Sequence, residues 1–158
     1  MYIYSNTTMN IGDNLMFKLK NTHIFRIPQG EEIVSYINKY AEKHGIEAGL
    51  VSIIGSLENI ELAYYDRGLN KYVTKTFPGT YELVSGNGNI SLKEGKPLSH
   101  IHVVIGDRNY NAYAGHLVKA TVFVAEVFIL EFEGDKKLVR EHVSENLWLW
   151  RTIGELSF

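Results

Sequence analysis

The segment Thr121-Val-Phe-Val-Ala-Glu-Val-Phe-Ile-Leu-Glu-Phe132 carries large apolar side chains on both of its alternating faces and is broken at its centre by Glu126. Successive side chains of an extended strand point to opposite sides of a sheet. A strand that is apolar on both sides is typical of the middle of a sheet whose two faces are covered. We therefore predict that residues 121–132 form a central strand, and we expect the rest of the chain to supply its neighbours and its cover.

One helix is predicted ahead of this strand, beginning at Glu31-Glu32 and ending at Gly45. Acidic residues in a first turn suit the positive end of the helix dipole, and glycine readily adopts the left-handed conformation of a C-terminal cap. Apolar residues recur between these limits at helical spacing. They are Ile33, Val34, Ile37, Tyr40 and Ala41.

Short extended segments fill most of the remaining chain. They are predicted at 15–27, 50–54, 60–65, 72–77, 80–92, 98–105 and 110–113. Gly55-Ser56 and Pro78-Gly79 are expected to end strands, whereas Gly86 and Gly88 predict a bulge or a close approach of two backbones. Many strands at hairpin spacing and one early helix indicate an α+β fold, with a mainly antiparallel sheet flanked by one or two helices.

The chain of 158 residues is expected to form a single domain, residues 1–158, with a core of about 15–133. Its aromatic tail, 138–158, contains Trp148 and Trp150, which we expect to be buried against the domain or a partner subunit. A net charge of -2 argues against general nucleic-acid binding. No cysteine, no signal-peptide pattern and no membrane-spanning run are present, so we expect a soluble cytoplasmic protein with no membrane contact.

Two histidines, His100 and His102, lie one residue apart in the predicted strand 98–105 and therefore share one face. A turn around Asp107-Arg108 would bring His116 back alongside them. Three imidazoles suit zinc or a similar divalent ion and would leave one coordination position open. The alternative is that these side chains are hydrogen-bonded histidines on a half-buried face.

Two carboxylates are further candidates for a role at such a site. Glu82 could orient an imidazole, act as a fourth ligand or contact a partner, and its alternative is a salt bridge or a solvent-exposed edge. For Glu126 we favour the salt bridge or the exposed edge. The glycines of Gly86-Asn87-Gly88-Asn89 lack the residues of a phosphate-binding loop, and no serine lies in a nucleophile elbow.

The order of several motifs resembles the plants-and-prokaryotes-conserved (PPC) domain, in its stand-alone prokaryotic form. They are Gly55-Ser56-Leu57, the segment from Pro78 to Ile90, Ser99-His100-Ile101-His102 and Gly115-His116-Leu117. The resemblance implies an antiparallel sheet flanked by helices, a homotrimer, and a metal site formed here by His100, His102 and His116. The sequence departs from the usual family pattern at Gly86-Asn87-Gly88.

We therefore expect a homotrimeric metal-binding protein, with zinc as the first choice of divalent ion and no assigned reaction. An alternative is a regulatory or scaffolding module that binds another protein, because a segment similar to Thr80–Val84 contacts proteins in the plant relatives. A second alternative is DNA binding, a function that is often assigned to the family that this chain resembles. The chain has no Arg-Gly-Arg-Pro of an AT-hook, so we expect no direct DNA binding.

Overall fold

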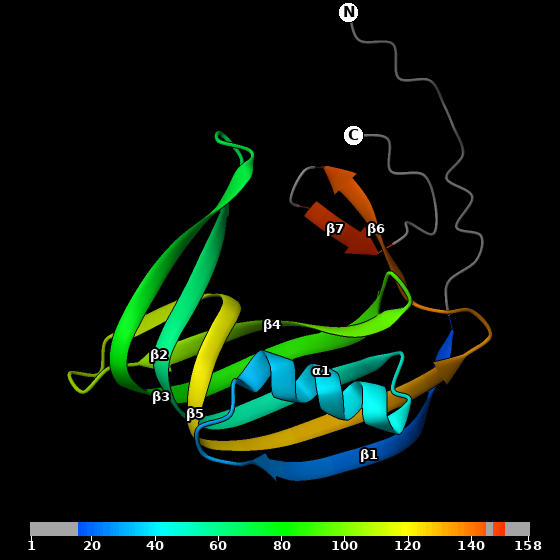
Figure 1. Ribbon diagram of the computed structural model, residues 1–158, viewed down its shortest axis with the longest axis horizontal. Coiled ribbons are helices and arrows are strands. Elements are labelled where there is room, and N and C mark those ends of the chain that lie inside the picture. The colour runs from blue at the N-terminus through cyan, green and yellow to red at the C-terminus, as the bar shows by residue number, and fades with distance from the viewer. Residues whose placement is uncertain (1–15, 145–146, 151–158) are drawn as a thin grey trace, which may run out of the picture.

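The computed structural model describes residues 16–144 and 147–150 (Figure 1). The elements, in chain order, are β1 (Phe17–Ile27), α1 (Ile33–His44), β2 (Gly49–Asp66), β3 (Lys71–Lys93), β4 (Lys96–Gly106), β5 (Ala112–Gly134), β6 (Val139–Ser144) and β7 (Leu147–Trp150). The mainly antiparallel sheet is confirmed. The described chain is dominated by strands and has one helix, so the α+β description overstates its helical part.

Strand β5 has the central position that the sequence predicts. It pairs with β1 on one side and with β2 on the other, both antiparallel. Strand β3 pairs with β2 and β4, and β4 in turn pairs with the first part of β5. The order β5–β2–β3–β4 therefore closes into a ring, and β1 is added at the outside.

The strands are longer than predicted, because Gly55 and Pro78-Gly79 do not end them. Strand β2 continues through Gly55, where its register with β3 shifts between Ile53 and Gly55. Strand β3 likewise continues through Gly79, whose φ of 86° is favourable only for glycine. Each glycine allows a local irregularity after which the hydrogen-bonded pairing resumes, so a predicted turn is in fact a bulge within a strand.

Helix α1 covers one face of the sheet, as Figure 1 shows. Its buried residues are Ile33, Ile37 and Ala41, which pack in one cluster with the inward residues of β2 and β5. The predicted C-terminal cap at Gly45 is confirmed by its left-handed conformation. The beginning of the helix differs: Glu32 is the N-cap, and its carboxylate accepts hydrogen bonds from two backbone N–H groups of the first turn.

The opposite face of the sheet has no such cover from the described residues. Phe128 on β5 is 48% exposed, and Ile24 beside it on β1 is 66% exposed. Leu50 and Ile54 on β2 are also exposed. The segment 121–132 is thus apolar on both sides, but only one side is buried within the chain. We refer to Ile24, Leu50, Ile54 and Phe128 as the open apolar face.

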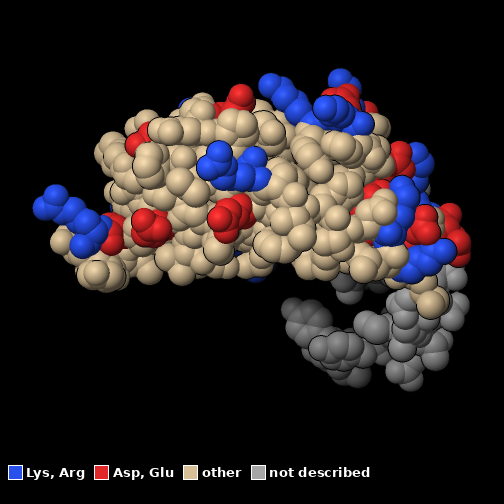
Figure 2. Space-filling view, turned by 90° about the horizontal axis from the view of Figure 1, so that it is seen from below, with Lys and Arg blue, Asp and Glu red and all other residues tan. Residues whose placement is uncertain are grey.

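Acidic and basic side chains are interspersed on the face seen in Figure 2, and much of that face is uncharged. Among the described residues, no helix is both long and apolar enough to cross a membrane.

The aromatic tail, in its described part, is the hairpin of β6 and β7. The first residues of β6 pair in parallel with the end of β3. The Trp150 indole N–H donates to Ser91 Oγ at 3.2 Å, and Lys93 Nζ lies 4.3 Å from the Trp148 ring centre. Trp150 remains 44% exposed, so the predicted burial is only partial within this chain.

Candidate metal centre

The three predicted histidines lie together where β4 and β5 meet. His100 and His102 point to the same side of β4, and His116 lies directly opposite His102 in the antiparallel pairing. The turn that joins the strands is held by Asp107, whose carboxylate accepts hydrogen bonds from the backbone and side chain of Asn111. The side-chain bond from Asn111 is the main cause of the lowered pKa of Asp107.

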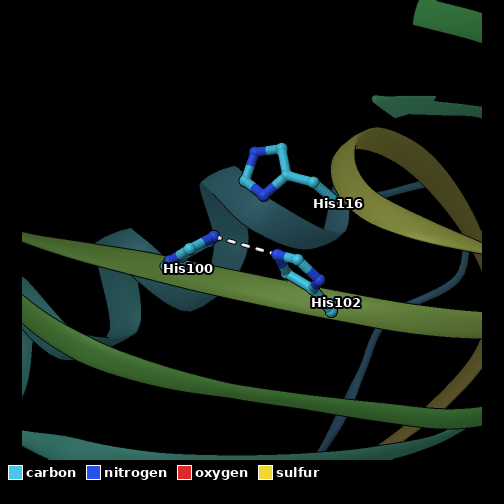
Figure 3. A group of neighbouring side chains, drawn as sticks. All are labelled: His100, His102 and His116. Carbon is cyan, nitrogen blue, oxygen red and sulfur yellow. Dashed lines mark hydrogen bonds between the residues drawn. The ribbon is translucent and has the colours of Figure 1, made fainter. Parts of the chain in front are cut away.

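The imidazoles converge closely enough to share one ion (Figure 3). One nitrogen of each ring can be chosen so that all three lie within 4.8 Å of one another, and Nε2 of His100 is 3.2 Å from Nε2 of His102. Two nitrogens bound to one tetrahedral zinc are about 3.3 Å apart. The pair on β4 already has this spacing, and in Figure 3 the His116 ring turns a nitrogen toward them.

His116 provides the test of whether a metal fits. Its Nδ1 is buried and has no hydrogen-bond partner. A buried polar atom without a partner is costly, and a metal ion would satisfy it. The residues present therefore fit a metal ion bound by three nitrogens.

Burial favours the neutral form of the His100 and His116 rings, which is the form that binds metals. Burial, then the charge of Arg140 and then the neighbouring imidazoles lower the pKa of His100 from 6.5 to about 4. Burial is also the main cause of the lowered pKa of His116. Both rings are neutral at pH 7.

Arg140 is the neighbour of this site that the sequence did not reveal. It lies on β6 and is only 6% exposed. Its Nε donates to Ser91 Oγ at 2.9 Å, and its Nη1 donates to the Trp148 carbonyl at 3.2 Å. Its Nη2 contacts both Asn89 Oδ1 at 2.8 Å and His100 Nδ1 at 3.2 Å. The hairpin thus brings a guanidinium against a candidate ligand.

This contact determines the position of the His100 proton. A guanidinium can only donate hydrogen bonds, so Nδ1 of His100 must accept one from Arg140. The proton of the neutral ring then lies on Nε2, from which it is donated to Nε2 of His102.

Neither predicted carboxylate joins the three histidines. Glu82 is exposed on β3, where its strand partners are Ser56 and Gly106. Gly106 lies four positions along β4 from His102, whose own partner on β3 is Asn87. Glu126 is exposed on β5 and open to water, but β5 pairs with β1 and β2 at this position, so Glu126 does not lie at the edge of the sheet that we expected.

Gly88 confirms the predicted close approach of two backbones. A side-chain carbon at this position would lie 2.3 Å from the His100 carbonyl oxygen. The absence of a side chain at Gly88 therefore lets β3 pack tightly against the backbone of His100 on β4.

Comparison with known proteins agrees with this architecture. The chain is 40% identical to a plant- and prokaryote-conserved (PPC) protein of Pyrococcus horikoshii, with a TM-score of 0.84, over 87% of this chain and 96% of that one. It is 33% identical to a metal-containing protein of Archaeoglobus fulgidus, with a TM-score of 0.82, over 89% and 99%. A proposed DNA-binding protein of Bacteroides thetaiotaomicron is 27% identical, with a TM-score of 0.75, over 86% and 97%.

The sequence matches no curated protein. Residues 16–133 match the model of a domain family. This range contains the closed ring of strands, helix α1 and all three histidines, and it ends before the hairpin that carries Arg140. The chain therefore belongs to the Plants and Prokaryotes Conserved (PCC) domain family.

Proposed function

We propose that this protein binds one divalent metal ion per chain through His100, His102 and His116. The observation that carries the proposal is the convergence of three imidazole nitrogens within 4.8 Å, together with the buried Nδ1 of His116 that has no other partner. The similar protein of Archaeoglobus fulgidus is described as metal-containing, which supports it. Zinc is the first choice because neutral imidazoles and low coordination numbers suit it.

The chain's own residues prepare this site for an ion. The strand pairing places two rings opposite each other, and burial keeps His100 and His116 neutral. When bound, a divalent ion with three protein ligands supplies an open position at which it can polarise a small molecule. The group of potential ligands found among the described residues consists of three histidines and includes no carboxylate, so we assign no reaction.

Elemental analysis of protein purified without a histidine tag tests the proposal. We expect about one zinc per chain after reconstitution, and at least a tenfold weaker affinity for the variants H100A, H102A and H116A. The matched control is H44A, which removes an exposed imidazole on α1. Metal well below one per chain in the reconstituted wild type would refute metal binding.

We also propose that the protein is a homotrimer that buries the open apolar face. Phe128, Ser52, Asn87 and His102 follow one another across β5, β2, β3 and β4 in register. Directly paired side chains point to the same side of a sheet, so the candidate metal centre and the open apolar face share one surface. An exposed patch of this kind marks an interaction site.

Light scattering tests this assembly. The wild type should have three times the chain mass of 18.0 kDa, and I54K should shift the protein toward the monomer. A monomeric wild type at micromolar concentration would refute the trimer.

We also propose that the protein is cytoplasmic, which is consistent with a chain that contains no cysteine.

A second candidate function is protein binding through Thr80–Val84. Glu82 is exposed there, and Val84 is 59% exposed on β3. A peptide partner found by crosslinking should lose affinity for the double variant E82A/V84A and retain it for H100A. The opposite pattern would assign the interaction to the histidines instead.

A further inference from the structure

Arg140 is a buried charge without a described counter-charge. It is 6% exposed, and its hydrogen-bond acceptors are a hydroxyl, an amide, a backbone carbonyl and an imidazole, all of them neutral. Glu47, Glu61, Glu131 and Glu133 form ion pairs with lysines or His23, and none of these pairs involves Arg140. Burying an unpaired guanidinium is costly, so its position calls for an anion.

The proposed metal increases this excess of positive charge. A divalent cation on three neutral imidazoles keeps both of its charges, and Arg140 adds a third beside His100. Ligating histidines usually donate their second N–H to a carboxylate or a carbonyl group, which offsets part of the metal's charge. Here a cation occupies that place.

The hydrogen bonds lead to the same conclusion. If a metal takes Nε2 of neutral His100, the ring proton must move to Nδ1. Nδ1 would then be a donor facing Nη2 of Arg140, which is also a donor, so their present contact is lost. Nη2 keeps Asn89 as an acceptor but has a second N–H that needs a new one.

We propose that the site binds its metal together with an oxyanion, a carboxylate or phosphate group, that takes the open coordination position and balances the charge of Arg140. This inference rests on the metal binding proposed above. The exposed side chain of His102 shows that the centre can be reached from solvent. Arg140 lies outside residues 16–133, so this chain adds the guanidinium to the family domain through its C-terminal hairpin.

Cobalt(II) titration, followed by visible absorption, tests the proposal. The wild type is titrated in a low-salt amine buffer alone, with sodium acetate, with inorganic phosphate, or with sodium chloride at the same ionic strength. We expect acetate or phosphate to strengthen cobalt binding by about tenfold or more, since a charge-assisted contact is worth about that factor. The anion that strengthens cobalt binding more, acetate or phosphate, identifies the oxyanion as a carboxylate or a phosphate group.

The variant R140Q should bind cobalt without this dependence on the oxyanion. The matched control is R26Q, which removes an exposed arginine from β1 and should behave as the wild type. Because Arg140 is buried, circular dichroism monitors folding, and R140K, which keeps the charge, should retain part of the oxyanion effect.

Two results would overturn the inference: a wild type whose cobalt affinity is indifferent to both oxyanions, or an equal oxyanion effect in the wild type and in folded R140Q. Failure of the wild type to bind cobalt under every condition would instead overturn the proposed metal site itself, and the inference with it.

Discussion

Nη2 of Arg140 lies 3.2 Å from Nδ1 of His100 and donates a hydrogen bond to it. The two residues are 40 positions apart and belong to different parts of the chain, the terminal hairpin and the family domain. Their contact joins the hairpin to the candidate metal centre, so the hairpin places a positive charge beside one of the three histidines.

The first prediction concerns the titration of His100. Burial and then Arg140 lower its pKa to about 4, so the ring should stay neutral until the pH falls well below 6. Replacement by R140Q removes the second of these causes and should raise this pKa toward the ordinary value. NMR titration of the His100 ring protons measures both midpoints in metal-free protein. An unchanged midpoint in folded R140Q would contradict the electrostatic role of Arg140.

The second prediction concerns acid stability and Glu131, which is 3% exposed. Burial raises its pKa, but hydrogen bonds from Lys20, Asn21 and His23 outweigh burial and lower the pKa from 4.5 to about 2. A lowered folded-state pKa gives stability that is present above pH 4.5 and is lost as the pH falls toward 2. Urea unfolding across this range should show the loss in the wild type.

The variant E131Q should lose this pH dependence and should be less stable at pH 7 by about 1–3 kcal/mol, since it weakens charged hydrogen bonds to a buried group. E133Q is the matched control. Glu133 makes a solvent-exposed ion pair with Lys18, whose loss should cost less than about 1 kcal/mol. Equal losses of stability in E131Q and E133Q would show that the buried hydrogen bonds of Glu131 stabilise the protein no more than an exposed ion pair does.

The third prediction concerns Gly88. The variant G88A places a methyl group against the His100 carbonyl, and the strand backbones must move apart. We expect a loss of stability of about 1–3 kcal/mol. We also expect weaker metal binding, because the movement of the strand displaces His100. G86A is the control, since its added carbon would find its nearest neighbour at 3.4 Å. Thermal unfolding and cobalt titration measure the two effects separately.

The fourth prediction concerns DNA. The net charge of -2 and the absence of Arg-Gly-Arg-Pro lead us to expect no shift of duplex DNA in an electrophoretic assay, even at low salt. A shift that weakens steeply with added salt would show that the chain binds DNA by itself.

The helix and the histidine group could be predicted because their signals are local. The spacing of Ile33, Ile37 and Ala41, followed by Gly45, determines the helix and its end. His100 and His102 share one face of the strand that contains them. The short connection to His116 makes it most direct for the following strand to pair antiparallel with this one, which places His116 beside them.

The continuous strands could not be predicted, because a glycine signals both a turn and a bulge. Whether Gly55 ends β2 depends on the partner strands, and its close approach to Val124 exists only in the assembled sheet. Arg140 was missed for a similar reason. Nothing near it in the sequence marks an arginine that will be buried, and the hairpin reaches His100 only through its pairing with the end of β3.

The closed ring of strands has a consequence for how the protein would take up an ion. His102 is held by β3 on one side and by His116's strand on the other, so the separation of these two imidazoles is fixed by backbone hydrogen bonds. The conformational entropy of arranging these ligands is therefore lost during folding and not during metal uptake. A chelator should empty this centre and leave the far-ultraviolet circular dichroism of the protein unchanged, in contrast to small zinc domains that unfold without their metal.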